Sequence, residues 1–307
     1  MAARPRRSAL MQLATDIMIA GSVGGIAKLI MAPTDRVKIL LQTQSSNPTV
    51  LSGLVVPYKG AWDCLVRVIQ EQGVISLYRG ILINILRYIP QQGAALILND
   101  AINNLFPRYD PKTDFWKAFS VKLLSGALAD IAAIIVCAPF DLARTRLASD
   151  MVPGRAAFSG FLELWSAVFL QHGLSGFLTG MSSVAIGSLT YRFGQLVCFK
   201  QIQDANPYRR EPGLFGAISS FVAVTLARSV VLPLTYPFDT VRRHMFLEAE
   251  LPHDSKEYHG SVECFFKIIN RDGISGLYQG LVFEFLRGFG GSLVIVGYDV
   301  LKKYFNR

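Results

Sequence analysis

Apolar residues gather into six long stretches separated by polar segments, and each stretch is long enough to cross a bilayer as a helix, which takes about 20 mostly apolar residues. Three shorter runs, at 61–72, 161–172 and 262–272, segregate polar and apolar residues at helical spacing, as helices lying on a membrane surface do. The long stretches predict helices over about residues 13–42, 81–106, 116–149, 180–205, 212–247 and 281–305.

Each long stretch also contains an ionisable residue, and one charge exposed to lipid costs a few kcal/mol or more. Six such helices are tenable only if the charged side chains face a wet interior. The pattern therefore predicts six helices around a polar cavity. The residues concerned are Lys28, Arg87, Asp130, Arg192, Arg228 and Arg287.

A motif of proline, any residue, aspartate, two residues and a base occurs three times, starting at Pro33, Pro139 and Pro237. The prolines are 106 and 98 residues apart, and glycines after each motif recur in register. A repeat of this kind fixes the architecture before any single motif does. We expect an all-α membrane protein of three pseudosymmetric repeats of about 100 residues, each with two transmembrane helices and a short surface helix. The predicted repeats are residues 1–110, 111–208 and 209–307.

Composition agrees with this class. The chain is 51% hydrophobic and 17% charged, with a mean hydropathy of +0.35, whereas soluble domains are ~25% charged. A net charge of +9 indicates an anionic partner, but many bases lie inside apolar stretches, so we do not expect nucleic acid. The four cysteines and four histidines show no metal-ligand spacing and no catalytic arrangement, so we expect neither a metal, nor an enzyme, nor a cofactor.

The three proline-aspartate-base motifs, with their glycines in register, resemble the mitochondrial carrier family over the whole chain. The resemblance implies a six-helix, threefold pseudosymmetric, multi-pass transporter of the mitochondrial inner membrane that works by alternating access. Within the family, the sequence resembles the ADP/ATP carrier subfamily, which implies exchange of adenine nucleotides. The segments that carry this similarity are 33–42, 87–90, 141–147, 236–243 and 286–291.

The chain departs from that subfamily at several positions. The signature Arg-Arg-Arg-Met-Met-Met is replaced over 242–247 by Arg-Arg-His-Met-Phe-Leu, and Gln195 interrupts the aromatic ladder between Tyr191 and Phe199. An asparagine of the subfamily aligns with Ala95. Two alternatives therefore stay open: a carrier of another anionic metabolite, or a carrier fold kept as a structural subunit of a larger inner-membrane complex with weakened or lost transport. Outside such a complex we expect a monomer.

The three aspartates of the repeated motif each precede a base by three residues, which allows pairs within one helix or a ring between repeats. The threefold repetition and the resemblance favour the ring. It would form the matrix gate of the carrier, and the resemblance adds Gln42 as a brace on it. The expected pairs are Asp35–Arg144, Asp141–Arg242 and Asp239–Lys38.

Binding a polyphosphate requires several fixed cations in a site of low dielectric. The candidate cations are Lys28, Arg87, Arg192, Arg243 and Arg287. The resemblance implies that Lys28, Arg87 and Arg287 meet the phosphates. It also implies that the adenine is met by three residues of the fourth predicted helix, namely Gly187, Ser188 and Tyr191.

Glycines begin the predicted surface helices and the second long helix of each repeat, and helix N-termini attract anions. By resemblance the ligand there is the lipid cardiolipin, whereas the simpler interpretation is turn glycines. The positions are Gly60, Gly73, Gly80, Gly160, Gly173, Gly180, Gly260, Gly273 and Gly280.

Two further predictions concern charges. Asp130 and Arg228 lie 11 residues before Asp141 and Asp239, so we expect both to face the cavity and to interact across it, directly or through water. The alternative is that each finds a separate local partner. The family's second ring, the cytoplasmic gate, is reduced to Asp100, Asp299 and Lys302, of which only the Asp100–Lys302 pair would form. Since the matrix gate keeps three pairs, we expect the empty protein to rest open to the cytoplasmic side.

Overall fold

The computed structural model describes residues 25, 28–107, 109, 113–152, 158, 160–206, 214–249, 251–252 and 255–286. All the regular elements within these residues are helices, as expected for an all-α protein. In the first repeat, a helix over residues 28–43 is followed by η1 (Gln44–Ser46), α2 (Pro48–Leu51), α3 (Ala61–Gln72), η2 (Val74–Tyr78), α4 (Ile81–Leu86) and α5 (Tyr88–Leu105).

The other two repeats follow the same order. The second contains α6 (Phe115–Ala148), α7 (Phe161–His172), η3 (Gly173–Leu178) and α8 (Met181–Asp204). The third contains α9 (Leu214–Leu247), α10 (Ser261–Gly276) and a helix over residues 281–286. Among the described residues, α6 is the one helix long and apolar enough to cross a membrane by length and composition alone, with a mean hydropathy of 2.1 over its most apolar window.

The predicted helix over 81–106 is divided at Arg87, where α4 ends and α5 begins. Pro90 has no N–H to donate to the carbonyl of Leu86, so the helical hydrogen-bond ladder loses one bond at this point. The backbone of Arg87 keeps helical angles and its N–H still donates to Ile83 (2.8 Å). The division is therefore a local interruption of one helix, and it falls at a candidate functional residue.

The surface helices anchor three small cores of equivalent composition. Cys64 of α3, Leu164 of α7 and Cys264 of α10 occupy the same position in their repeats and are fully buried. The two cysteines are thus packing residues, in agreement with their repeat positions. These cores hold the C-terminal parts of the helix over 28–43, α6 and α9 against the loops that follow them.

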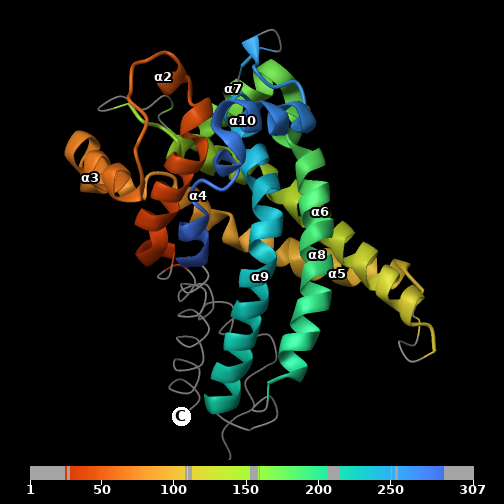
Figure 1. Ribbon diagram of the computed structural model, residues 1–307. Coiled ribbons are helices and arrows are strands. Elements are labelled where there is room, and N and C mark those ends of the chain that lie inside the picture. Colours follow the sequence, from red (N-terminus) through yellow and green to blue (C-terminus); the bar gives the residue numbers. More distant parts are fainter. Residues whose placement is uncertain are drawn as a thin grey trace, which may run out of the picture.

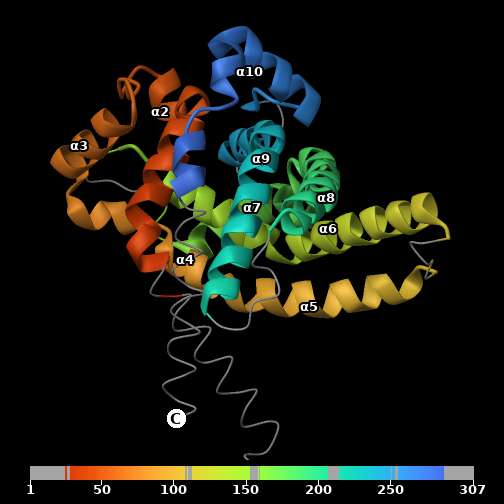
Figure 2. The same ribbon diagram turned by 60° about the horizontal axis from the view of Figure 1, so that its bottom comes forward.

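The long helices are arranged as two diverging pairs. Figure 1 shows α8 and α9 side by side along their length and α5 beside α6, with the two pairs running in different directions. Figure 2 shows the same separation from another angle. Among the described residues, the helix over 28–43, α6 and α9 meet near the C-terminal ends of α6 and α9.

Candidate substrate cavity and gate

Acids and bases of the three repeated motifs meet where the odd helices converge. Arg144 donates to Asp35 (2.5 Å), Arg242 to Asp141 (3.1 Å), and Lys38 to Asp239 (3.2 Å). These are the three contacts that the ring interpretation predicts, and each joins two repeats. The ion pairs hold the helix over 28–43, α6 and α9 together in a closed ring, which we call the gate ring.

The gate ring has further partners that sequence reasoning did not find. Asp141 also accepts from Arg87, Asp239 from Arg243 (3.0 Å), and Lys38 donates to Glu284 (2.7 Å). Lys38 is only 3% exposed, and leaving a charge unpaired at such a depth is strongly destabilising. The extra partners mean that Lys38, Asp141 and Asp239 each keep a counter-ion when one contact of the ring breaks.

Gln42 braces the ring in the predicted position. Its side-chain amide donates to Thr240 (2.8 Å) and, at 3.5 Å, to Asp239. At the equivalent position of the third repeat, the ring of Phe246 lies 4.8 Å from the Arg242 guanidinium. This cation–π contact lies within α9, so Phe246 does not brace the ring between repeats as Gln42 does.

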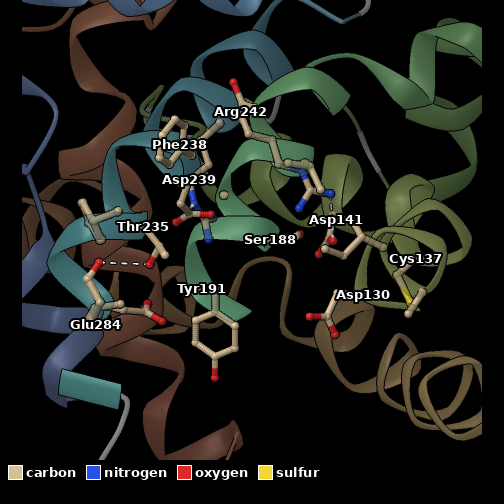
Figure 3. A pocket seen from close by; sticks show the side chains of 18 of the residues that line it. Asp130, Cys137, Asp141, Ser188, Tyr191, Thr235, Phe238, Asp239, Arg242 and Glu284 are labelled. Atoms are coloured by element: carbon tan, nitrogen blue, oxygen red, sulfur yellow. Dashed lines mark hydrogen bonds and ion pairs between the residues drawn. The ribbon is translucent and has the colours of Figure 1, made fainter. Parts of the chain in front are cut away.

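A cavity of about 470 Å³ opens beside the gate ring. Figure 3 shows Asp130, Cys137 and Asp141 on one side of it, Thr235 and Glu284 on the other, and Ser188 and Tyr191 between them. Within the part of the chain that the structure describes, acids and bases are equal in number in the cavity wall, four of each. They are Asp130, Asp141, Asp239 and Glu284, together with Arg87, Arg228, Arg242 and Arg243. Arg87, Arg242 and Arg243 also border a smaller cavity of about 150 Å³.

The predicted phosphate-binding cations differ in their partners and in whether they line the cavity. Arg87 and Arg243 line the cavity and are paired with acids of the gate ring. Lys28 donates to the backbone carbonyl of Asn84 (2.7 Å). Arg287 lies outside the described residues, so four of the five predicted cations can be placed.

Arg192 is also paired with an acid. Its guanidinium contacts both carboxylate oxygens of Asp130, with Nη2 at 2.6 Å from Oδ1, and its role in phosphate binding stays a prediction. A Cβ at Gly126 would lie 3.2 Å from Arg192 Nε, so the glycine makes room for the guanidinium on α6. Arg192 thus ties α8 to α6 in a two-contact ion pair.

The predicted interaction between Asp130 and Arg228 is wrong, although both residues line the cavity as expected. Asp130 pairs with Arg192, and Arg228 lies 3.6 Å from Glu284. Each charge has thus found a nearer partner. Glu284 could have been noticed in the sequence because it is an acid in the apolar part of the sixth stretch, three residues before Arg287 and four after Gly280.

The residues expected at the adenine, Gly187, Ser188 and Tyr191, all lie on α8 and line the cavity. Gly187 also has a packing role, because a Cβ there would lie 3.1 Å from Cβ of Phe238 on α9. The absent side chain therefore permits close contact between α8 and α9, which bounds the cavity on this side.

The second predicted gate can be located only in part. Asp100 is an exposed residue of α5, whereas Asp299 and Lys302 lie outside the described residues. The pairing expected between Asp100 and Lys302 stays a prediction.

The glycines expected to hold cardiolipin have structural reasons of their own. Gly60, Gly160 and Gly260 precede α3, α7 and α10. The other six, Gly73, Gly80, Gly173, Gly180, Gly273 and Gly280, have positive φ angles between 62° and 81°, which residues with a side chain rarely adopt. Lipid binding at these positions stays a prediction.

The threefold helical repeat, the ring that joins the odd helices and the cavity beside it define a carrier. The chain belongs to the mitochondrial carrier family: the family model described as "Mitochondrial carrier protein" matches residues 10–110, 115–208 and 214–307, each within one predicted repeat. The chain is 39% identical over 305 residues to the ADP,ATP carrier protein of Parachlorella kessleri, covering 96% of this chain and 86% of the relative.

Two other relatives are similar over nearly their whole length. A mitochondrial substrate carrier family protein of Dictyostelium discoideum, ancA, is 37% identical over 292 residues (94% of this chain, 92% of the relative). The human ADP/ATP translocase 4 is 33% identical over 296 residues (95% of this chain, 91% of the relative). This chain is therefore a mitochondrial carrier by descent.

Proposed function

We propose that the protein is an antiporter of the mitochondrial inner membrane that exchanges ADP for ATP by alternating access. The observation that carries the proposal is an arginine-lined cavity beside a closed ring of three inter-repeat ion pairs. The chain is also 33–39% identical to relatives named as ADP/ATP carriers. The protein would be a transporter and not an enzyme, because the proposed function consists of substrate binding and a change of conformation, with no chemical step.

The chemistry of the cavity suits a polyphosphate. A phosphate offers several acceptor oxygens to guanidinium groups, and such charge-assisted contacts are about twice as strong as neutral hydrogen bonds. A nucleotide bound to Arg87 or Arg243 would compete with Asp141 and Asp239, which hold those arginines in the gate ring. Substrate binding would thereby weaken the ring, since a ligand shifts an equilibrium by its differential affinity for the two states.

A carrier of another anionic metabolite is the second candidate. Among the described residues, the cavity lining holds as many acids as bases, which is compatible with a substrate of lower charge than a nucleoside triphosphate. A purely structural role is less well supported, because a subunit that does not open has no need of a ring of paired charges between its repeats. We further propose that cardiolipin binds at the helix-initiating glycines and that the carrier acts as a monomer.

A thermal-shift screen of the purified protein against nucleotides and inorganic phosphate, followed by exchange in liposomes, tests the proposal. We expect ADP and ATP to raise the melting temperature and to exchange, and Arg87→Ala and Arg287→Ala to abolish exchange. Lys117→Ala, at an exposed ion pair near the start of α6, is the control. Normal exchange by both arginine variants, or uptake of non-nucleotide anions alone, would refute the assignment.

A further inference from the structure

Arg228 and Glu284 form an unequal ion pair at the edge of the cavity. The side chain of Arg228, on α9, is 46% exposed, whereas Glu284, on the helix over 281–286, is 9% exposed. The nearest nitrogen and oxygen lie 3.6 Å apart, beyond hydrogen-bonding distance. The pair is therefore long, and its basic member faces the cavity.

Glu284 has a closer partner behind it. Its second carboxylate oxygen lies 2.7 Å from Nζ of Lys38, a buried member of the gate ring. If Glu284 lost its contact with Arg228, it would still be neutralised by Lys38. Breaking the Arg228–Glu284 contact would thus leave no buried charge unpaired. An unpaired buried charge is what makes the loss of other buried ion pairs costly.

The other cavity-lining arginines are held more firmly. Arg87, Arg242 and Arg243 are only 11–13% exposed and pair with aspartates of the gate ring. An anion that took one of them would have to compete with the gate itself. Among the described arginines of the lining, Arg228 is the one whose partner a ligand can replace without disturbing the ring.

The repeats show that the fold does not require this pair. The residue four positions after the equivalent glycine is Asn84 in the first repeat, Val184 in the second and Glu284 in the third. The counterpart of Arg228 in the second repeat is Asp130, which has the opposite charge. The pair is therefore absent from the other two repeats. Since it lines the cavity and the fold does not need it, it is in a position to contact a ligand.

We propose that Arg228 is a further substrate-binding residue and that a phosphate group of the substrate replaces Glu284 on it. This inference rests on the proposed nucleotide exchange. A guanidinium can bind two phosphate oxygens at once, whereas the Arg228–Glu284 contact is long, at 3.6 Å, and its basic member is 46% exposed, so the contact contributes little free energy. The exchange of partners is thus favourable for an anion with several oxygens.

The test measures affinity of the full-length protein in detergent for ADP and ATP by titration calorimetry. Glu284→Gln keeps an oxygen for Lys38 and removes the competing charge, so both affinities should rise by about twofold to fivefold, the factor of a partly exposed ion pair. Arg228→Gln should lower both affinities by about tenfold, the loss of one charge-assisted contact. In the Arg228→Gln background, Glu284→Gln should change affinity much less than it does alone.

Asp114→Asn removes one negative charge at the far end of α6 and is the matched control; it should leave both affinities unchanged. Glu284→Asn, which copies the first repeat, checks that the gain comes from the charge. Additive effects of Arg228→Gln and Glu284→Gln, or no gain in Glu284→Gln, would overturn the inference while leaving the proposed function intact. A wild-type protein that binds no nucleotide would overturn both.

Discussion

Three glycines show how a single residue supports the gate. Gly80, Gly180 and Gly280 have positive φ, and a Cβ at each would lie 3.1–3.4 Å from backbone atoms of a gate-ring base. The bases concerned are Arg144, Arg242 and Lys38 respectively. The helix that begins at each glycine is thereby held directly against the neighbouring odd helix.

The substitution Gly280→Ala should lower the melting temperature through two effects. Forcing alanine to a φ of +81° costs about 1–2 kcal/mol, and its methyl group would crowd the Lys38 carbonyl at 3.1 Å. Gly53→Ala is the control, because Gly53 has a φ of +74° but open space around a Cβ. A thermal-unfolding comparison in which both variants lose equal stability would show that contact with Lys38 is unimportant.

Glu248 gives the stability a dependence on pH. It is buried after the end of α9 and accepts from the Tyr258 N–H (3.0 Å), and burial raises the pKa of its carboxyl group. A carboxyl whose pKa is raised by folding stabilises the folded state fully below its unfolded pKa of about 4.3. That contribution is lost as the pH rises through the folded pKa.

Glu248→Gln should therefore raise the melting temperature relative to the wild type at pH 8, and the gain should shrink towards pH 4. Glu263→Gln has the opposite sign, because a hydrogen bond from Lys267 lowers the pKa of Glu263. This second variant should gain nothing at pH 8. Melting curves at several pH values decide the matter, and a gain for Glu248→Gln that does not vary with pH would contradict the prediction.

The contacts of the gate ring could be predicted from the sequence, because a motif repeated three times defines both depth and face. The partners of Asp130 and Arg228 could not. Their repeat positions gave the depth of each side chain, but Arg192 and Glu284 lie at similar depth on neighbouring helices and are nearer. Which of several charges pair inside a cavity depends on side-chain reach, which spacing along the chain does not encode.

At the scale of helices, the Asp130–Arg192 pair is a link between α6 and α8. If Arg192 serves this link and not the substrate, then Arg192→Gln should lower the stability of the fold, because it leaves Asp130 unpaired. Breaking a well-buried pair costs about 3 kcal/mol or more. The loss should be smaller here, since both side chains are about 30% exposed. Adding Asp130→Asn should then recover much of the lost stability.

Nucleotide affinity of the Arg192→Gln/Asp130→Asn double variant, measured by calorimetry, distinguishes the two roles. We expect it to stay within a factor of about two of the wild type, since both charges of a self-contained pair are removed together. A tenfold loss of affinity in the double variant would instead support the prediction that Arg192 binds a phosphate.

The long helices α6, α8 and α9 could be predicted from apolar stretches, but the short elements between them could not. The 3-10 turns η2 and η3 lie between the surface helices and the next long helix, in segments whose hydrophobic pattern does not distinguish a turn from a helix end. The division at Arg87 is another such detail. In both cases the geometry follows from local backbone angles and from packing between repeats.

At the scale of the whole molecule, the two diverging helix pairs and the closed gate ring describe one state (Figures 1 and 2). Among the described residues, the three repeats are joined at the gate ring. By the family resemblance, we expect the end that holds the gate ring to face the matrix. A closed gate ring is then what we expect of a carrier whose cavity is open to the cytoplasmic side.

The last prediction is that this state dominates when no substrate is bound. Three ion pairs between repeats close the gate ring, against the single pair expected at the opposite end, and at a net ~1 kcal/mol per pair the difference is about 2 kcal/mol. That corresponds to a bias of roughly thirtyfold between the two states.

Labelling of single cysteines with a membrane-impermeant maleimide tests this prediction. The cysteines are placed at the cavity positions Ser188 and Thr235, in a variant without other reactive thiols, and they report which side of the cavity is open. Labelling should come mainly from the cytoplasmic face, and Asp35→Asn, which removes one pair, should reduce the bias about fivefold. Predominant labelling from the matrix face without substrate would contradict the prediction, because the intact gate ring would then not hold that side closed.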